Sequence, residues 1–185
     1  NKINNLKENM RQSLGEAKAI CPDELLDALL DWSLFQKSES LGLYMAMEDE
    51  VDLNSLLDLD KKTFLPAYDS VGKSYFMAEV ENTSDLCVGK FGILEPSVSC
   101  RKALANEVDL WLVPGRAFDD KGHRLGRGRG FYDRLLADES GVKLGVPVDG
   151  LLVEDVPVDE WDVRMDYLLV KEGVRDVQSL LNKGL

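Results

Sequence analysis

Hydrophobic and polar residues follow two different patterns along this chain. From Ile3 to Leu14, apolar residues recur every three to four positions, which predicts an amphipathic helix. A leucine-rich run with similar spacing follows Pro22 and predicts a second helix over residues 23–35. Beyond residue 40, short apolar or alternating runs bounded by turn residues predict strands instead. The predicted strands are residues 41–47, 63–68, 74–80, 108–113, 142–148 and 166–170.

Helical segments fall between several of these strands, at residues 52–59, 99–105, 132–138 and 174–181. Parallel strands need crossover connections, so strands that alternate with helices predict a mostly parallel sheet with helices on both faces. The expected fold is a three-layer α/β/α domain that spans residues 1–185 as a single unit. Residues 63–80 can instead form an antiparallel hairpin at one edge, because the gap between the two runs is short and rich in turn residues.

The richest candidate for chemistry is the stretch of residues 113–134, VPGRAFDDKGHRLGRGRGFYDR. Glycines let backbone N–H groups approach an anion closely, and arginines add positive charge. The stretch follows an apolar run typical of a buried strand and leads into a predicted helix, which is where α/β sheets bind phosphorylated ligands. The glycines are Gly126, Gly128 and Gly130, and the arginines are Arg124, Arg127 and Arg129. This pattern predicts a phosphate-binding loop.

Other interpretations of the same stretch compete with a phosphate-binding loop. Repeats of Gly and Arg also occur in flexible tails that bind nucleic acid, but the neighbouring Leu125, Phe131 and Tyr132 are unusual in a disordered tail. A tight, solvated connection without a ligand stays open as an alternative. A Walker A loop is excluded, because Ala67 stands where that motif needs its first glycine ahead of residues 72–74.

The net charge of the chain, −12, argues against binding to nucleic acid or to an anionic membrane surface. Residues 116–134 nevertheless contain six Lys or Arg against three Asp or Glu, which suits a small phosphorylated ligand. No apolar run approaches the ~20 residues of a membrane span, and the polar start does not resemble a signal peptide. The three cysteines suggest neither a disulfide framework nor a thiolate metal site. We expect a cytoplasmic protein, and a monomer, although the sequence does not specify the oligomeric state.

Several residues outside the loop have an ordinary structural interpretation when they are taken alone. Lys7 and Arg11 lie four positions apart on one face of the first helix, which is typical of a solvated face. Met45 and Phe91 fit a hydrophobic core, and residues 48–50 fit a solvated acidic turn. The residues by themselves favour these structural roles over a binding site.

Asp133 directly follows the glycine loop, where a polyphosphate would repel a carboxylate unless a cation lay between them. Mg²⁺ is the expected cation, since few carboxylates hold it together with phosphate oxygens and water. Asp162, taken alone, is typical of an exposed acidic residue. His123 is the only histidine, which excludes a histidine metal cluster, and we expect it to be an exposed loop residue.

The run from Phe118 to Asp133, F-D-x-x-G-x-R-L-G-x-G-x-G-[YF]-Y-D, resembles the signature of 5-formyltetrahydrofolate cyclo-ligases, also called methenyltetrahydrofolate synthetases. Weaker similarities extend over most of the chain, at residues 7–11, 45–51, 64–66, 91–96 and 156–166. The resemblance implies a cytosolic enzyme that uses ATP and Mg²⁺ to close 5-formyltetrahydrofolate, with or without a polyglutamate tail, into 5,10-methenyltetrahydrofolate. ADP and phosphate are the implied co-products.

The resemblance also implies roles for individual residues. Arg127, Arg129 and Lys7 are the implied catalytic residues, because they stabilise charge on the transferring phosphate. The implied ATP-binding residues are Lys7, Arg11, Arg124, Leu125, Gly126, Arg127, Gly128, Arg129, Gly130, Phe131 and Tyr132. The implied substrate-binding residues are Met45, Glu50, Phe91 and Tyr132, and the implied metal ligands are Asp133 and Asp162.

The sequence departs from the family pattern on the folate side. Ala67, Leu53 and Leu151 stand where the family often has Arg, Thr and Gln, and their loss affects substrate contacts rather than the glycine loop. The main alternative is a non-catalytic or repurposed relative that binds nucleotide or phosphate. A sugar-phosphate isomerase or transferase is a further alternative, for which a catalytic carboxylate and no ATP are expected.

Overall fold

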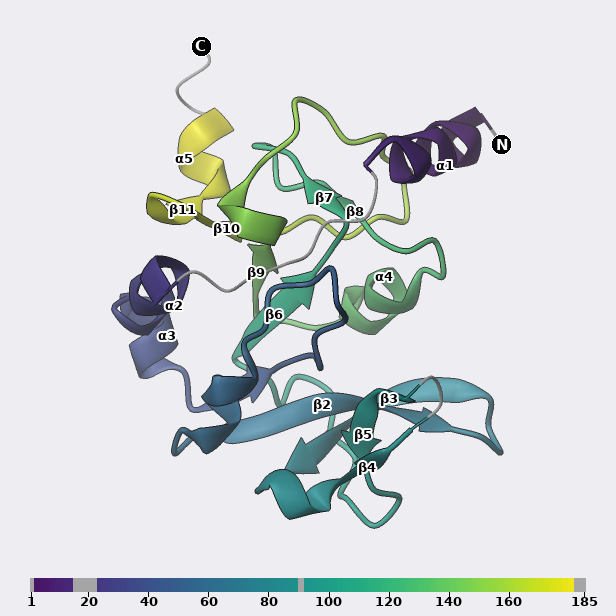
Figure 1. The fold of residues 1–185 in the computed structure, drawn as a ribbon, viewed down its shortest axis with the longest axis vertical. Coiled ribbons are helices and arrows are strands. Elements are labelled where there is room, and N and C mark those ends of the chain that lie inside the picture. Colours follow the sequence, from purple (N-terminus) through teal and green to yellow (C-terminus); the bar gives the residue numbers. More distant parts are fainter. Residues whose placement is uncertain (1, 15–22, 90–91, 182–185) are drawn as a thin grey trace.

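The computed structural model describes residues 2–14, 23–89 and 92–181, and within them a seven-stranded mixed sheet forms the centre of the molecule (Figure 1). Its strand order is β11-β10-β9-β6-β1-β2-β3. The strands are β1 (Ser40–Gly42), β2 (Lys62–Asp69), β3 (Ser74–Val80), β6 (Leu110–Pro114), β9 (Val142–Val146), β10 (Tyr167–Val170) and β11 (Gly173–Asp176). The inner neighbours pair in parallel, and the two outer pairs, β2 with β3 and β10 with β11, are antiparallel. The predicted parallel sheet and its antiparallel edge hairpin are both confirmed.

Alternation along the strands sends side chains to two separate cores. In β6, Leu110 and Leu112 join the core under α2 (Asp23–Leu30) and α3 (Ser33–Lys37), whereas Trp111 and Val113 join the opposite one. That second core is closed by Leu136 of α4 (Phe131–Leu136) and Val177 of α5 (Val177–Leu181). Helices therefore cover both faces of the sheet, as a three-layer α/β/α fold requires.

Two glycines make room for the largest side chains of the second core. A Cβ atom at Gly42 would lie 2.4 Å from Cε3 of Trp111, and one at Gly145 would lie 2.7 Å from Cε1 of Phe118. Both rings are almost completely buried. Gly42 and Gly145 occupy strand positions where close packing against a ring excludes any side chain.

The first helix, α1 (Lys2–Ser13), packs away from the sheet against a small hairpin of β7 (Ala117–Phe118) and β8 (Arg124–Leu125). Met10 and Leu14 contact a third cluster that contains Ala117 and Leu125. This apolar contact holds α1 next to the glycine-rich stretch, which begins where β8 ends.

Several predicted elements differ in the structure. The helix predicted at residues 23–35 is broken, because Trp32 adopts an extended backbone and separates α2 from α3. Residues 52–59 form only a short 3₁₀ helix, η1 (Asn54–Asp58). The strand predicted at residues 41–47 is shorter in the structure: β1 ends at Gly42, and one further backbone hydrogen bond, from Leu43 to Phe64 of β2 at 2.8 Å, follows it.

The C-terminal helix prediction was wrong in its first half. Residues 173–176 form β11, which pairs antiparallel with β10, and α5 begins only at Val177. Two further strands, β4 (Leu86–Val88) and β5 (Leu94–Pro96), pair in a separate small sheet next to short 3₁₀ helix η2 (Thr83–Asp85). A third 3₁₀ helix, η4 (Val148–Gly150), follows β9.

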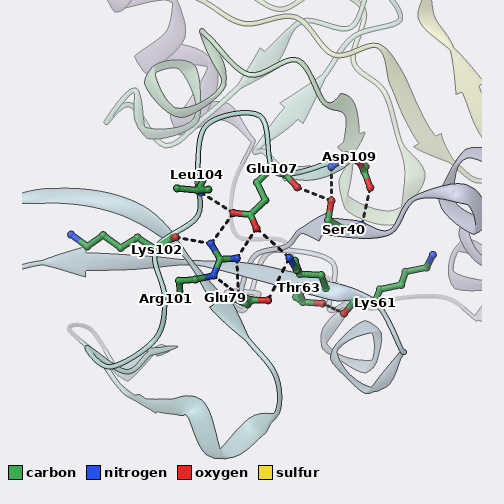
Figure 2. A network of polar contacts seen from close by, with 10 residues as sticks. Ser40, Lys61, Thr63, Glu79, Arg101, Lys102, Leu104, Glu107 and Asp109 are labelled. Carbon is green, nitrogen blue, oxygen red and sulfur yellow. Dashed lines mark hydrogen bonds and ion pairs between the residues drawn. The ribbon is translucent and has the colours of Figure 1, made fainter.

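The helix predicted at residues 99–105 is absent, because a polar network holds this stretch extended along β3 (Figure 2). Arg101 donates to Glu79 at 2.7 Å and to Glu107 at 2.9 and 2.6 Å. Glu107 also accepts from Nζ of Lys62 at 3.2 Å and from the backbone N–H of Leu104 at 2.9 Å. The stretch therefore gains its hydrogen bonds from side chains and β3 rather than from a helix.

Replacing Glu107 with Gln is expected to lower the melting temperature by roughly 2–4 °C at neutral pH. Hydrogen bonds from Arg101 and Leu104 lower the pKa of the Glu107 carboxyl from 4.5 to about 2. A carboxyl whose pKa is lowered by folding stabilises the fold above its unfolded pKa of 4.5, and the stabilisation is lost as pH falls toward 2. Melting curves between pH 7 and pH 2 should therefore converge for the two proteins at low pH.

Glu81, which is exposed, provides the matched control for this experiment. Glu81→Gln makes the same chemical change and should melt with the wild-type pH dependence. A Glu107→Gln variant whose melting temperature stays below that of the wild type by the same amount at every pH would contradict the assignment.

Candidate active site

A cavity of about 750 Å³ opens at the carboxyl ends of the central strands. Met45 and Glu50 line it after β1, and Pro114 lines it at the end of β6. Pro66 and Tyr75 of the β2–β3 hairpin form the opposite wall. Side chains that are distant in sequence meet here because parallel strands end at the same edge of the sheet.

The glycine-rich loop forms one side of this cavity and leads into α4. Gly126, Arg127, Arg129 and Gly130 all line it. Gly128 and Gly130 have φ angles of 88° and 58°, a left-handed conformation that glycine adopts most readily. The predicted loop therefore borders a cavity, although the small β7–β8 hairpin separates it from the buried strand that was expected to precede it directly.

The N-terminal helix α1 contacts the glycine-rich loop. Nε of Arg11 donates to the carbonyl of Gly126 at 2.8 Å, and a Cβ atom at Gly128 would lie 3.2 Å from Cζ of Arg11. Lys7 is buried and forms an ion pair with Asp162. The structure thus brings Arg11 to the loop and Lys7 to Asp162, but neither is among the residues that line the cavity.

The buried side chain of Arg124, which precedes the glycine loop, bonds to Asp133, which follows it. Arg124 donates to both carboxylate oxygens of Asp133, at 3.2 and 3.1 Å, and to the carbonyl of Pro114 at 3.3 Å. Its guanidinium also lies over the ring of Tyr132, 5.4 Å from the ring centre. Arg124 thereby ties α4 to the end of β6 and fixes the direction in which the loop leaves the hairpin.

The two predicted metal ligands both accept hydrogen bonds from residues 159–163, the segment that contains Asp162 itself. Asp133 accepts from the backbone N–H of Val163 at 3.3 Å, and Asp162 accepts from the N–H of Asp159 at 2.7 Å. Across residues 2–14, 23–89 and 92–181, no group of three or more His, Cys, Asp or Glu side chains is placed to hold a metal ion. Mg²⁺ commonly binds one or two carboxylates together with substrate phosphates. The donor set fits a metal ion that arrives with a nucleotide, and it does not form a complete protein cage.

Arg127 is held by the turn that follows β1. It forms ion pairs with Asp49 and with Glu50, the latter over 3.2 Å, and Arg116 pairs with the other oxygen of Asp49 at 2.7 Å. Burial works against the charge of Arg127, but the hydrogen bond to Asp49 and the charge of Glu50 raise its pKa above the usual value of an arginine. The side chains of Asp49 and Glu50 are only 17% and 10% exposed, so of the acidic turn at residues 48–50 that the sequence alone favoured as solvated, only Glu48 is exposed.

The residues implied for folate binding meet in the cavity. Met45, Glu50 and Tyr132 line it, whereas Phe91 lies outside the residues that the structure describes. Burial and the charge of Glu50 raise the pKa of Tyr132, which keeps its hydroxyl protonated. Phe131 packs between Tyr132 and Tyr75, with ring centres 4.8 and 4.9 Å apart. The cavity therefore has one aromatic wall, which suits a flat heterocycle.

Two other expectations change with the structure. Leu125 is fully buried in the third cluster, so only its backbone is available to a ligand. His123 is partly buried, and its Nδ1 lies 2.9 Å from Oδ2 of the buried Asp119, which corrects its assignment as an exposed loop residue. Asp119 is part of the hairpin that carries the loop rather than part of the cavity lining.

Sequence reasoning missed three residues of the site. Asp49 pairs with Arg127 through one oxygen and with Arg116 through the other. Tyr75 extends the aromatic wall from the β2–β3 hairpin. Asp49 lies inside the run MAMEDEV, whose similarity to the family was the one available signal. Arg116 lies inside the basic stretch of residues 113–134, where it counted only toward the local charge, and Tyr75 has no local pattern that marks it.

Fold and cavity together define an α/β protein with a basic, glycine-rich loop at the carboxyl edge of its sheet, an arrangement typical of proteins that bind phosphorylated ligands. The chain belongs to the 5-formyltetrahydrofolate cyclo-ligase family, whose profile matches residues 3–171. The resemblance seen in the glycine-rich stretch is thereby confirmed.

Named relatives agree with the family. A 5-formyltetrahydrofolate cyclo-ligase of Haemophilus influenzae is 32% identical over 145 residues, which cover 73% of this chain and 77% of the relative. One from Escherichia coli K12 is 32% identical over 147 residues, covering 74% and 80%. The solved structure of Aquifex aeolicus 5,10-methenyltetrahydrofolate synthetase is 33% identical, with a TM-score of 0.73, and the match covers 96% of this chain and 90% of that one.

One finding concerns membranes. In the described part of the chain, no helix combines the length and the apolar character that crossing a bilayer requires.

Proposed function

We propose that this chain is a 5-formyltetrahydrofolate cyclo-ligase that uses ATP and Mg²⁺ and releases ADP and phosphate. Family membership makes it a ligase of folate one-carbon metabolism. The observation that carries the proposal is a single cavity that unites the two halves of the site. Met45, Glu50 and Tyr132 share it with Arg127 and the glycine loop. A reaction between two bound substrates requires this adjacency.

Positive charge in the cavity supports the ATP half of the proposal. Arg124, Arg127, Arg129 and Arg134 line it in a chain whose net charge is −12. Cations of this kind stabilise the charge that spreads over a transferring phosphoryl group. We assign the phosphates of ATP to the loop, with Arg129 and Arg127 on the transferring group and Lys7 and Arg11 reaching it from α1.

The proposed chemistry needs no covalent nucleophile from the protein. The formyl oxygen accepts the terminal phosphoryl group of ATP, the neighbouring folate nitrogen attacks the formyl carbon, and phosphate leaves as the ring closes. Tyr132 and Phe131 form a wall that excludes water from the reacting carbon. Glu50 accepts N–H donors of the pterin and thereby fixes its orientation, while Met45 packs against its flat face.

The metal half of the proposal rests on Asp133, with Asp162 as the second carboxylate. Bound Mg²⁺ would neutralise phosphate charge between these carboxylates and the nucleotide. Asp133 is paired with Arg124 and Asp162 with Lys7, so each carboxylate already has a cation beside it. In this proposal, Lys7 turns from Asp162 toward phosphate when the nucleotide is bound.

The residues that depart from the family pattern do not line the cavity. Ala67 and Leu53 are buried, Leu151 is exposed, and none of the three is among its lining residues. Nothing in the family or its named relatives favours the non-catalytic alternative.

Purified protein with 5-formyltetrahydrofolate, ATP and Mg²⁺ is expected to form the methenyl chromophore and release one phosphate per turnover. Arg129→Ala should lower kcat/KM for ATP by roughly 10- to 100-fold, because it removes a charged hydrogen bond of about 1.5–3 kcal/mol. Absorbance and phosphate release, both at saturating folate, provide the two readouts.

Arg175→Ala is the matched control, since Arg175 lies on β11 and its ion pair within the described residues is with Glu172. It should turn over at the wild-type rate. If no chromophore forms while calorimetry still detects ATP with Mg²⁺, the chain is instead a repurposed nucleotide-binding relative.

A further inference from the structure

Four charged side chains at the edge of the cavity form a connected set, which we call the Asp49 clasp: Asp49, Glu50, Arg116 and Arg127. Asp49 uses one oxygen for Arg127 and the other for Arg116. Glu50 also uses both oxygens, since Oε1 pairs with Nε of Arg127 and Oε2 accepts from the N–H of Met47 at 3.1 Å. Every carboxylate oxygen of the clasp therefore has a donor.

The clasp joins the two halves of the proposed site. Arg127 is assigned to a phosphate of ATP, and Glu50 is assigned to the N–H donors of the pterin, yet in this structure they are partners of each other. A phosphate that approaches Arg127 meets the negative charge of Asp49 and Glu50 as well. The closed clasp therefore weakens the interaction between Arg127 and an anion.

Arg116 keeps the Asp49 carboxylate paired with a cation when Arg127 leaves the clasp. The Asp49 side chain is 17% exposed, and breaking its pair with Arg127 would leave a poorly hydrated carboxylate if it had no other partner. Arg116 lies 2.7 Å from the second oxygen and remains in place when Arg127 turns away. Glu50 has no second cation among the ion pairs of the described residues, so a ligand that donates to it replaces what Arg127 supplied.

We propose that Asp49 and Glu50 hold Arg127 back from ATP in the free enzyme, and that folate binding at Glu50 releases it, so the two substrates bind cooperatively. This inference rests on the proposed function. Asp49 is a positioning residue in this scheme, because it acts on ATP through Arg127. Linkage requires each substrate to strengthen the binding of the other by the same factor.

Calorimetry with a non-hydrolysable ATP analogue and Mg²⁺ tests the scheme without turnover. In the wild type, saturating 5-formyltetrahydrofolate should lower the Kd of the analogue about tenfold, and the analogue should lower the Kd of the folate equally. Arg127→Ala should leave the Kd of the analogue nearly unchanged without folate and abolish the tenfold gain with it. A simple phosphate contact predicts the same loss of affinity in both conditions.

Asp49→Asn distinguishes positioning from damage, because the scheme predicts a gain. The variant should bind the analogue several-fold more tightly than the wild type in the absence of folate. Asp60→Asn, which removes an exposed carboxylate from the same connection between β1 and β2, should bind it with the wild-type Kd. Unchanged or weaker binding by Asp49→Asn would overturn the inference, as would equal losses for Arg127→Ala with and without folate.

The two proposals fail separately in these experiments. A wild type that forms the chromophore but shows no change in analogue Kd with folate retains the proposed function and loses the clasp. A wild type that forms no chromophore contradicts the proposed function and, with it, the release of Arg127 by folate. Whether Asp49 holds Arg127 back is tested separately, by the affinity of Asp49→Asn for the analogue without folate.

Discussion

Replacing Arg124 with Met is expected to lower ATP-dependent cyclisation at least about 100-fold and to lower the free energy of unfolding by about 3 kcal/mol. Arg124 is 5% exposed in its side chain and gives Asp133 two hydrogen bonds, so its loss leaves a poorly hydrated carboxylate without its partner. The carbonyl of Pro114 loses a donor as well. Activity falls further because the glycine loop loses its tie to α4 and β6.

A double variant separates these two effects. Arg124→Met with Asp133→Asn removes the unpaired charge, so urea denaturation should recover most of the lost free energy of unfolding. Steady-state kinetics should not recover, because Asp133 is the proposed ligand of Mg²⁺. An Arg124→Met protein that is as stable as the wild type and turns over within tenfold of it would remove Arg124 from its organising role.

Asp119→Ala should lower the free energy of unfolding by roughly 3–5 kcal/mol, although Asp119 does not line the cavity. Its carboxylate is fully buried and accepts from the backbone N–H groups of Lys121, His123 and Val156 at 3.0, 2.9 and 3.0 Å. Nδ1 of His123 lies 2.9 Å from it too. Alanine leaves these donors without an acceptor, and for the buried N–H of Val156 the penalty is larger than the net value of an ordinary hydrogen bond.

Urea denaturation followed by circular dichroism measures this effect. Asp119→Asn keeps one acceptor oxygen and should lose about half as much free energy of unfolding. Its neighbour Asp120 is exposed, so Asp120→Ala should unfold at the wild-type midpoint. Equal midpoints for Asp119→Ala and Asp120→Ala would show that the hairpin does not depend on the buried carboxylate.

The structure confirms the parts of the fold that depend on short-range pattern. The continuous apolar run from Leu110 to Val113 predicted a strand buried on both faces, and its residues do point alternately into the two cores. The turn-rich gap between β2 and β3 indicated the edge hairpin for a similarly local reason. The errors lie where a distant partner decided the outcome. Residues 174–176, predicted as the start of a helix over 174–181, belong instead to β11, because β10 supplies antiparallel hydrogen bonds.

The candidate site divides in the same way. The glycine loop was visible because its backbone conformation makes a local demand, which Gly128 and Gly130 meet with positive φ angles. The contribution of Tyr75 to the aromatic wall was not visible in the sequence, because Tyr75 reaches Phe131 only through the folded β2–β3 hairpin.

The sequence by itself determined the class of this protein: a mostly parallel α/β sheet, a basic glycine loop and membership of the cyclo-ligase family. These properties are encoded in contiguous residues, where periodicity and glycine positions carry the information. Only the tertiary structure decided which charges meet. Arg127 and Asp49 are 78 residues apart, and Lys7 and Asp162 are 155 apart. An ion pair leaves no local pattern, because its energy depends on the distance between two side chains and on their burial, both of which arise only when the chain has folded.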